Sequence, residues 1–177
     1  MENVTIRQET VEDYEKVFEL ITAAFQDEEY TDHREQYLVE RLRKSVAFVP
    51  ELSLVAETNG RLVGHILLSK ITIRNDKETY GSLALAPVSV AKNYRKQGIG
   101  GDLIKKAHKK AYELGFDSVI LLGHADYYPR FGYQSASKFG IRLPFDAPDE
   151  NCMALELRKD GLKSVSGRVE YPPEFFE

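Results

Sequence analysis

The sequence predicts a mixed α/β fold, in which a mostly antiparallel sheet contains one parallel pair of strands. Apolar strands follow one another in a meander from Leu52 to Val90, with the hairpin signal Asn59-Gly60 between two of them. An apolar strand over 83–90, a glycine-rich turn, an amphipathic helix and an apolar strand over 116–122 then follow in the order of a right-handed parallel crossover. With 177 residues, of which 42% are hydrophobic, the chain is expected to form one domain over residues 1–177.

The N-terminal part predicts a short strand and two helices. Val4 and Ile6 alternate with polar residues, as in a strand with one buried face. Thr10 has the position of a helix N-cap, with Asp13 as the acid of a capping box, and apolar residues recur at helical spacing until a helix end near Phe25. A second helical pattern carries Tyr37, Leu38, Arg41 and Leu42.

An acidic stretch, Gln26-Asp27-Glu28-Glu29-Tyr30, lies between these two helices. A charged run of this kind is usually a solvated connection, which is the simpler interpretation. The alternative, a role in attracting a cationic substrate, stays open.

The strands of the meander are predicted from alternation and from turn residues. Apolar residues alternate with polar or small ones from Leu52 to Ala56, and a longer return strand covers 62–73, so these two strands should pair antiparallel. A further turn near Asn75-Asp76 leads into the strand that ends at Val90.

The turn after Val90 has the features of an anion-binding site. It reads Tyr94-Arg95-Lys96-Gln97 and then Gly98-Ile99-Gly100-Gly101, where a helix begins. The first N–H groups of a helix have no partner within it and lie at the positive end of the helix dipole. Arg95 and Lys96 add full charges, and the glycines lack the Cβ that would hold a phosphate away from the backbone. The turn therefore predicts a phosphorylated ligand.

The spacing of this turn differs from two common phosphate motifs. Arg95-x-x-Gly98-x-Gly100 is not the dinucleotide pattern G-x-G-x-x-G. It is not the mononucleotide phosphate loop either, because no lysine follows the last glycine and an arginine comes first.

An amphipathic helix and a buried strand follow the turn. Lysines at 105, 106, 109 and 110 lie mainly on the polar side of the helix, where solvation is the simpler interpretation and phosphate binding the less favoured one. Gly115 is expected to stop the helix, and residues 116–122 are apolar nearly throughout, as in a buried strand. The apolar side of the helix carries Ile99, Leu103, Ala107 and Ala111.

The segment 123–133 predicts a short helix. Asp126 would cap it, Gly132 would end it, and a strand would begin at Tyr133. Beyond it, residues 153–157 predict a closing strand, and the tail around Tyr171-Pro172-Pro173 is expected to be extended and poor in helix.

These motifs resemble the GNAT (GCN5-related) N-acetyltransferases. Arg95-x-x-Gly98-x-Gly100 is similar to their pyrophosphate loop, and Tyr128, four residues before Gly132, matches their Tyr-x-x-x-Gly-[Phe/Tyr] segment. The paired Tyr127-Tyr128 and the end Gly167-x-Val169-x-Tyr171-Pro-Pro look most similar to the predicted N-acetyltransferases of the YhbS type. The chain departs from many GNAT enzymes where they carry an asparagine before the short helix, since His124 and Asp126 stand nearby instead.

The resemblance implies a fold and a reaction. The fold would be a mixed, mostly antiparallel sheet of about seven strands with one splayed parallel pair, flanked by about four helices. The reaction would move an acetyl group from acetyl-CoA to a primary amine by direct attack in a ternary complex. The alternative is a protein that binds acetyl-CoA without turnover, as a sensor or interaction module. A mononucleotide enzyme is disfavoured, because the lysine and the Mg²⁺ ligands are missing.

The resemblance also implies roles for individual residues. In this family the coenzyme arm lies between two splayed strands and bonds like an added strand, which by position would use the backbone of Val88 and Val90. The Val90 N–H would then stabilise charge on the acetyl oxygen, and Tyr128 would face the departing sulfur; these are the candidate catalytic groups. The candidate coenzyme-binding residues are Val88, Ser89, Val90, Arg95, Lys96, Gln97, Gly98, Ile99, Gly100, Gly101 and Tyr128.

Structural interpretations stand beside these roles. Tyr128 could instead be an aromatic wedge that packs the short helix on the sheet, and Tyr127 is expected to be structural. The base that deprotonates the amine is not identified by the sequence, and neither is the amine acceptor. The candidate bases are His65, His124, Asp126 and Glu28.

Composition bears on partners and location. A formal net charge of −4 and a pI near 5.7 disfavour broad binding to nucleic acid or to an anionic membrane surface. No apolar run is long enough to span a bilayer and none resembles a signal peptide, so a cytoplasmic protein is expected, and the single Cys152 fits a reducing compartment. The histidines and the cysteine lack ligand spacing, so no metal is expected. A homodimer is one option for the assembly.

Overall fold

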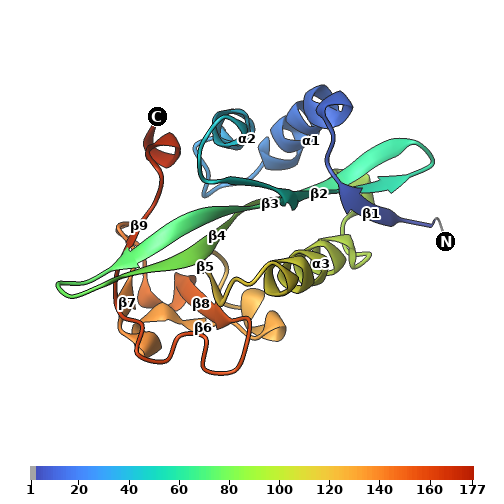
Figure 1. Ribbon diagram of the computed structural model, residues 1–177. Coiled ribbons are helices and arrows are strands. Elements are labelled where there is room, and N and C mark those ends of the chain that lie inside the picture. The colour runs from blue at the N-terminus through green and yellow to red at the C-terminus, as the bar shows by residue number, and fades with distance from the viewer. Residues whose placement is uncertain (1–2) are drawn as a thin grey trace.

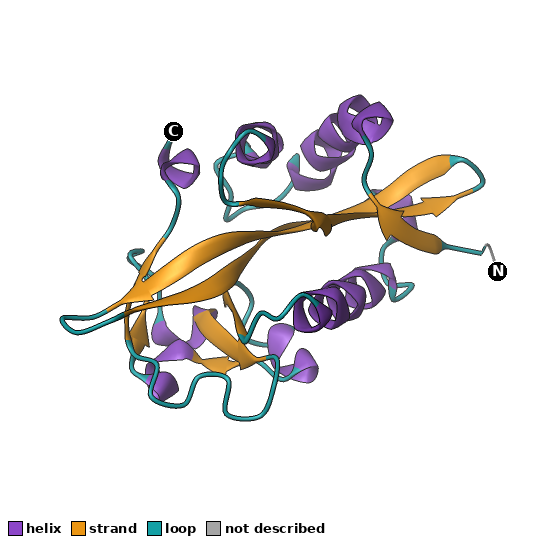
Figure 2. Ribbon diagram, viewed as in Figure 1, coloured by secondary structure: helices purple, strands orange, loops and turns teal. Residues whose placement is uncertain are grey.

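Nine strands form one sheet with helices on both faces. The computed structural model describes residues 3–177, and Figures 1 and 2 show α1 and α2 on one face of the sheet and α3 on the other. The strand order is β1-β2-β3-β4-β5-β8-β6, and β9 pairs with β3 and β7. The strands are β1 Thr5–Gln8, β2 Phe48–Thr58, β3 Arg61–Arg74, β4 Thr79–Val90, β5 Ser118–Leu122, β6 Gln134–Ser135, β7 Ile141–Arg142, β8 Cys152–Glu156 and β9 Gly167–Glu170. The α-helices of residues 3–177 are α1 Tyr14–Phe25, α2 Glu35–Arg43 and α3 Ile99–Glu113.

Long hairpins build the antiparallel half of the sheet, as predicted. β2 and β3 meet at Asn59-Gly60, where φ is 50° and 73°, because a tight two-residue hairpin turn needs positive φ at both positions. β3 and β4 pair from Arg74 opposite Thr79 to Gly64 opposite Val90, so their hairpin runs along most of the sheet (Figure 1). The predicted meander is confirmed.

β4 and β5 form the predicted parallel pair, and their pairing is short. It consists of Leu83 with Val119 and Ala84 with Ile120. β4 continues to Val90 without a partner on the β5 side, although β3 pairs with it up to that residue. A register shift in the β3–β4 ladder, between Ile66 and Leu68, lies close to where the two parallel strands separate. The strands therefore splay, and the edge of β4 is left open beyond residue 84.

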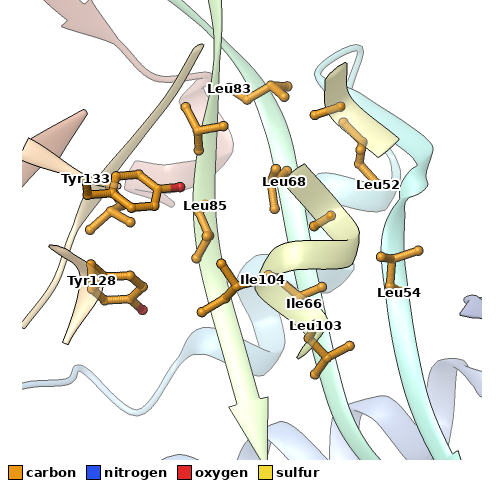
Figure 3. Packing of buried hydrophobic residues seen from close by; sticks show 14 of the residues in the cluster. Leu52, Leu54, Ile66, Leu68, Leu83, Leu85, Leu103, Ile104, Tyr128 and Tyr133 are labelled. Carbon is orange, nitrogen blue, oxygen red and sulfur yellow. The ribbon is translucent and has the colours of Figure 1, made fainter. Parts of the chain in front are cut away.

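Buried side chains join the layers of the fold. The group between α3 and the sheet includes Leu83, Leu85 and Leu103, and Figure 3 shows these side chains gathered around β4 and α3. On the other face, Val17 of α1 and Leu42 of α2 pack in a second group. Burying one such side chain fully contributes about 1.5–3 kcal/mol, so both helical layers are held mainly by apolar contact.

The start of the first helix agrees with the predicted capping box. The Asp13 carboxylate accepts a hydrogen bond from the Thr10 N–H at 2.8 Å. The first turn, Val11–Asp13, is a 3₁₀ turn, so the α-helix proper begins at Tyr14 and ends at Phe25 as predicted.

Two local predictions in the C-terminal part are wrong. The predicted short helix is present as one turn of 3₁₀ helix over Tyr128–Phe131, but the predicted cap is wrong, because Tyr127 and not Asp126 precedes it and no side chain caps it. The turn does end at Gly132, whose φ of 99° suits a residue without a Cβ. One turn of this kind does not count as an α-helix, so three α-helices stand where about four were expected.

The tail differs from its prediction as well. It was expected to be extended, yet Pro173–Phe176 forms a 3₁₀ turn, preceded by β9. β9 pairs with Thr72–Arg74 of β3, beyond the point where β2 leaves that edge. A second parallel pair, β7 with β9, joins the sheet there.

None of the helices in residues 3–177 has the length and apolar character needed to cross a membrane.

Candidate functional site

The turn between β4 and α3 presents unpaired backbone N–H groups. Lys96 and Gly98 have positive φ, 63° and 85°, which folds the chain tightly into the start of α3 at Ile99. Within residues 3–177, the five amides of 97–101 donate to no acceptor. The first protein-bonded amide of the helix is that of Asp102, which donates to the Gly98 carbonyl at 3.0 Å. Free amides at the positive end of a helix dipole form an open anion site.

Glycine is favoured at positions 98 and 100 for different reasons. A Cβ on Gly98 would meet nothing within 4 Å, so glycine is favoured there by its positive φ. A Cβ on Gly100 would lie 3.4 Å from the Tyr127 hydroxyl oxygen and 3.6 Å from a methyl group of Val90. Gly100 therefore lies where the turn, the end of β4 and the loop that carries Tyr127 come close together.

Arg95 links the turn to neighbouring elements. Its Nη2 donates to the Ala24 carbonyl at 2.6 Å, and its Nε donates to the Val90 carbonyl at 3.3 Å. The guanidinium therefore joins the end of α1 to the end of β4, and its charge stays at the mouth of the site. Lys92, in the same turn, forms an ion pair with Asp27, so the acidic stretch after α1 lies beside this turn.

The open edge of β4 carries the backbone groups that the sequence singled out. The Ala91 N–H donates to the Val63 carbonyl of β3 at 2.8 Å. Hydrogen-bonding direction alternates along an antiparallel strand, so the backbone of Ser89 faces β3, and that of Val88 and Val90 faces the side from which β5 has diverged. The Ser89 hydroxyl is buried without a partner within residues 3–177. Val88 and Val90 therefore reach the splayed edge, and Ser89 does not.

Tyr128 lies in an aromatic stack beside β4. Its ring is edge-on to Tyr127 at 5.1 Å and to Tyr133 at 5.9 Å between centroids, and Figure 3 shows Tyr128 and Tyr133 side by side next to Leu85. Only 9% of Tyr128 is exposed, and this burial raises the pKa of its hydroxyl to about 12. Tyr128 is thus a protonated hydrogen-bond donor at neutral pH.

The stack is anchored on α3 by a partly buried histidine, His108. His108 Nε2 lies 2.8 Å from the Tyr133 hydroxyl. Burial lowers the pKa of His108 to about 4 and raises the pKa of Tyr133 well above its usual value, so both groups are neutral. This hydrogen bond between two neutral groups fixes Tyr133, against which Tyr128 packs.

One of the four candidate bases lies in the core. His65 is 0% exposed, its Nε2 lies 3.1 Å from the Ser53 hydroxyl, and Glu9 and Arg43 form a buried ion pair beside it. Burial, and secondarily the Arg43 charge, lower the pKa of His65 to about 3. His65 is therefore a neutral core residue that an amine substrate cannot reach. The other three candidates, Glu28, His124 and Asp126, are exposed.

Two residues near the site were not predicted to matter. Tyr127 was expected to be structural, yet its hydroxyl lies beside Gly100. Gly123, at the end of β5, lies directly against the Tyr128 ring and exchanges hydrogen bonds of 2.9 Å with Asn151. The Tyr127-Tyr128 pair was the sequence feature that could have drawn attention to Tyr127. Its contact with Gly100 could not be predicted, because the two residues are distant in the chain.

Other site types find less support in the described part of the chain. No group of three or more His, Cys, Asp or Glu side chains in residues 3–177 is arranged to hold a metal ion. Two surface hollows lie away from the glycine turn. One is lined by Lys16, Glu19 and Arg61, and the other by Arg74, Asp76 and Arg142.

Comparison with known proteins identifies the family of this chain. The family model described as acetyltransferase (GNAT) domain matches residues 5–136. YjhQ of Escherichia coli K12, an uncharacterized N-acetyltransferase, is 35% identical over 119 residues, which are 67% of this chain and 66% of YjhQ, so the match spans just under two thirds of that relative.

Two solved structures share the fold over nearly the whole chain. The crystal structure of YhbS from Escherichia coli in complex with CoA has a TM-score of 0.90 at 26% identity, and covers 100% of this chain and 94% of that one. A GNAT family acetyltransferase from Brucella melitensis in complex with acetyl-CoA has a TM-score of 0.81 at 29% identity, and covers 99% of both chains.

Proposed function

Because the chain belongs to the acetyltransferase (GNAT) domain family, we propose that it transfers an acetyl group from acetyl-CoA to a primary amine, by direct attack in a ternary complex. The relatives with solved structures were crystallised with CoA or acetyl-CoA, which supports the same coenzyme here. The whole activity is assigned to one domain over residues 1–177.

The observation that carries the proposal is the set of unpaired amides over 97–101 at the mouth of the splayed strands. A diphosphate needs several hydrogen-bond donors and nearby positive charge, and the turn offers both, with Lys96 exposed beside the amides. The open edge of β4 beyond Ala84 offers further backbone donors and acceptors to an extended amide-containing chain. Coenzyme A contains both a diphosphate and such a chain, so its chemistry fits this site.

The end of β4 would orient and activate the acetyl group. The Val90 carbonyl already accepts a hydrogen bond from Arg95, whereas the Val90 N–H has no acceptor within residues 3–177. In the proposed reaction this N–H donates to the acetyl oxygen as negative charge develops there. A fixed donor of this kind is worth about 3–4 kcal/mol of transition-state stabilisation.

Tyr128 would assist departure of the sulfur as a hydrogen-bond donor. Its pKa of about 12 makes full proton transfer to a thiolate, whose acid has a pKa of about 8.5, unfavourable by about 5 kcal/mol. A hydrogen bond from the neutral hydroxyl stabilises the leaving thiolate without that cost. The proton that the thiol finally carries would come from the newly acetylated amine.

Two measurements test the proposal. In thermal unfolding, acetyl-CoA should raise the midpoint temperature and ATP should not; stabilisation by ATP and not by acetyl-CoA would contradict the assignment. Release of free thiol should then be followed with a panel of small amines, polyamines, aminoglycosides and lysine peptides. Stabilisation by acetyl-CoA without thiol release from any amine would favour a binding module over an enzyme.

A further inference from the structure

We propose that the hydroxyl of Tyr127 is a coenzyme-binding group, which donates a hydrogen bond to the diphosphate held by the glycine turn. This inference rests on the proposed function and adds a contact from the opposite wall of the site. The turn belongs to the segment between β4 and α3, whereas Tyr127 lies in the loop after β5. The two walls meet at Gly100.

The position of the hydroxyl is the first argument. The Tyr127 oxygen lies 3.4 Å from the point where a Cβ of Gly100 would stand, and Gly100 carries one of the unpaired amides. A Val90 methyl group lies 3.6 Å from the same point. The hydroxyl therefore lies where the turn, the open end of β4 and the loop after β5 converge.

The second argument is that the Tyr127 ring is held from three sides. It is edge-on to Tyr128 at 5.1 Å and to Phe131 at 5.3 Å, and the Arg130 guanidinium lies 4.6 Å from its centroid. Arg130 Nε also donates to the Tyr127 carbonyl at 2.9 Å. Phe131 in turn lies 3.5 Å from the point where a Cβ of Gly101 would stand. A donor fixed in this way loses little conformational freedom when a ligand binds.

The third argument is that the hydroxyl is free to donate. It has no hydrogen-bond partner within residues 3–177, whereas the half-buried ring contacts Tyr128, Phe131 and Arg130. Burial raises the pKa of Tyr127, so the hydroxyl keeps its proton at neutral pH. Phenylalanine would pack equally well, so the hydroxyl adds a hydrogen-bond donor that the packing of the ring does not use.

The test removes this oxygen and keeps the ring. For Tyr127→Phe, titration calorimetry with CoA should give a Kd about tenfold higher than that of the parent, because a hydrogen bond to a charged group is lost. Tyr112→Phe is the matched control, since its half-exposed ring lies near the other end of α3, and its Kd should equal that of the parent. An unchanged Kd for Tyr127→Phe would overturn the inference.

A second acetyl donor shows which part of the coenzyme the Tyr127 hydroxyl contacts. S-acetyl-pantetheine lacks the diphosphate, so Tyr127→Phe should have the kcat/KM of the parent with this donor and a reduced kcat/KM with acetyl-CoA. An equal loss with both donors would mean that the ring had moved, which would overturn a diphosphate contact. Binding of CoA to the parent is measured first. A parent that binds no CoA refutes the proposed function itself, whereas a parent that binds CoA as tightly as Tyr127→Phe refutes only the role of Tyr127.

Discussion

Gly123 and Tyr128 are in such close contact that no other residue fits at position 123 without movement. A Cβ on Gly123 would stand 2.5 Å from Cε2 of the Tyr128 ring, and the glycine is fixed by its two hydrogen bonds to Asn151. The end of β5 thereby sets the position of the tyrosine that faces the splayed strands.

Gly123→Ala should therefore displace the Tyr128 ring. We expect a loss of about 1–3 kcal/mol in the free energy of unfolding, as for other overpacked sites, together with a lower kcat. Urea unfolding and steady-state kinetics measure the two effects. Gly81→Ala is the control, because nothing lies within 4 Å of a Cβ there. A kcat equal to that of the parent would show that turnover does not depend on the ring position.

Tyr128→Phe should lower kcat by about tenfold or more, because the leaving thiolate loses its hydrogen-bond donor. The ring still fills its place in the stack, so the Kd for CoA should stay within about twofold of the parent value. Stopped-flow thiol release and calorimetry separate these quantities. If the variant turns over at the parent rate, Tyr128 is an aromatic wedge and has no part in the reaction.

Gly100→Val should weaken coenzyme binding by at least about tenfold, because its side chain would fill the space between the turn, Tyr127 and Val90. Calorimetry with CoA measures the loss, and circular dichroism verifies that α3 is intact. Gly81→Val, at an exposed glycine of β4, controls for the effect of a β-branched residue. An unaltered affinity in Gly100→Val would show that the diphosphate binds elsewhere.

Arg43→Met should destabilise the fold by about 3–5 kcal/mol, because it leaves the Glu9 carboxylate buried without its cation. The pair is closed from solvent, with side-chain exposures of 7% and 1% and a distance of 2.6 Å between Nη2 and Oε2. Adding Glu9→Gln to Arg43→Met should restore most of the loss in urea unfolding. Arg74→Met, which breaks an exposed pair with Glu170, should cost less than about 1 kcal/mol. Equal losses in the two single variants would contradict the role assigned to the buried pair.

Stability should fall as the pH is lowered through the histidine range. His65 and His108 have ordinary pKa values of 6.5, and burial lowers them in the folded state to about 3 and about 4. Below pH 6.5 the unfolded chain binds protons that the folded chain does not, so the free energy of unfolding decreases by up to about 1.4 kcal/mol per pH unit for each histidine. The stabilising contribution is complete above pH 6.5 and is lost towards pH 3–4.

Urea unfolding over this pH range measures the slope. His108→Gln should reduce it by about half, because one of the two histidines with a lowered pKa is removed. A slope identical to that of the parent would mean that the pKa of His108 is not lowered in the folded chain.

The order of elements and the unpaired amides of the glycine turn could be predicted from the sequence. The hairpin at Asn59-Gly60 and the helix start after Gly98 depend on residues adjacent in the chain, so their signals are local. The errors arose where local signals misled. Asp126 is a good N-cap residue by type, but the 3₁₀ helix begins two residues later, at Tyr128. β9 has no clear strand signal in the sequence, and it forms by pairing with the uncovered edge of β3.

Some features of the candidate site could be predicted from the sequence, and others could not. The sequence was enough to predict unpaired amides over 97–101, because a strand, a turn and a helix start are consecutive and their backbone geometry follows from nearby residues. Tyr128 was identified through the family resemblance. The folded chain was needed to show that β4 and β5 separate after Ala84, that the Tyr127 hydroxyl lies beside Gly100, and that His65 is buried in the core. These relationships join segments distant in the chain. They depend on how the layers pack, which no local run of residues encodes.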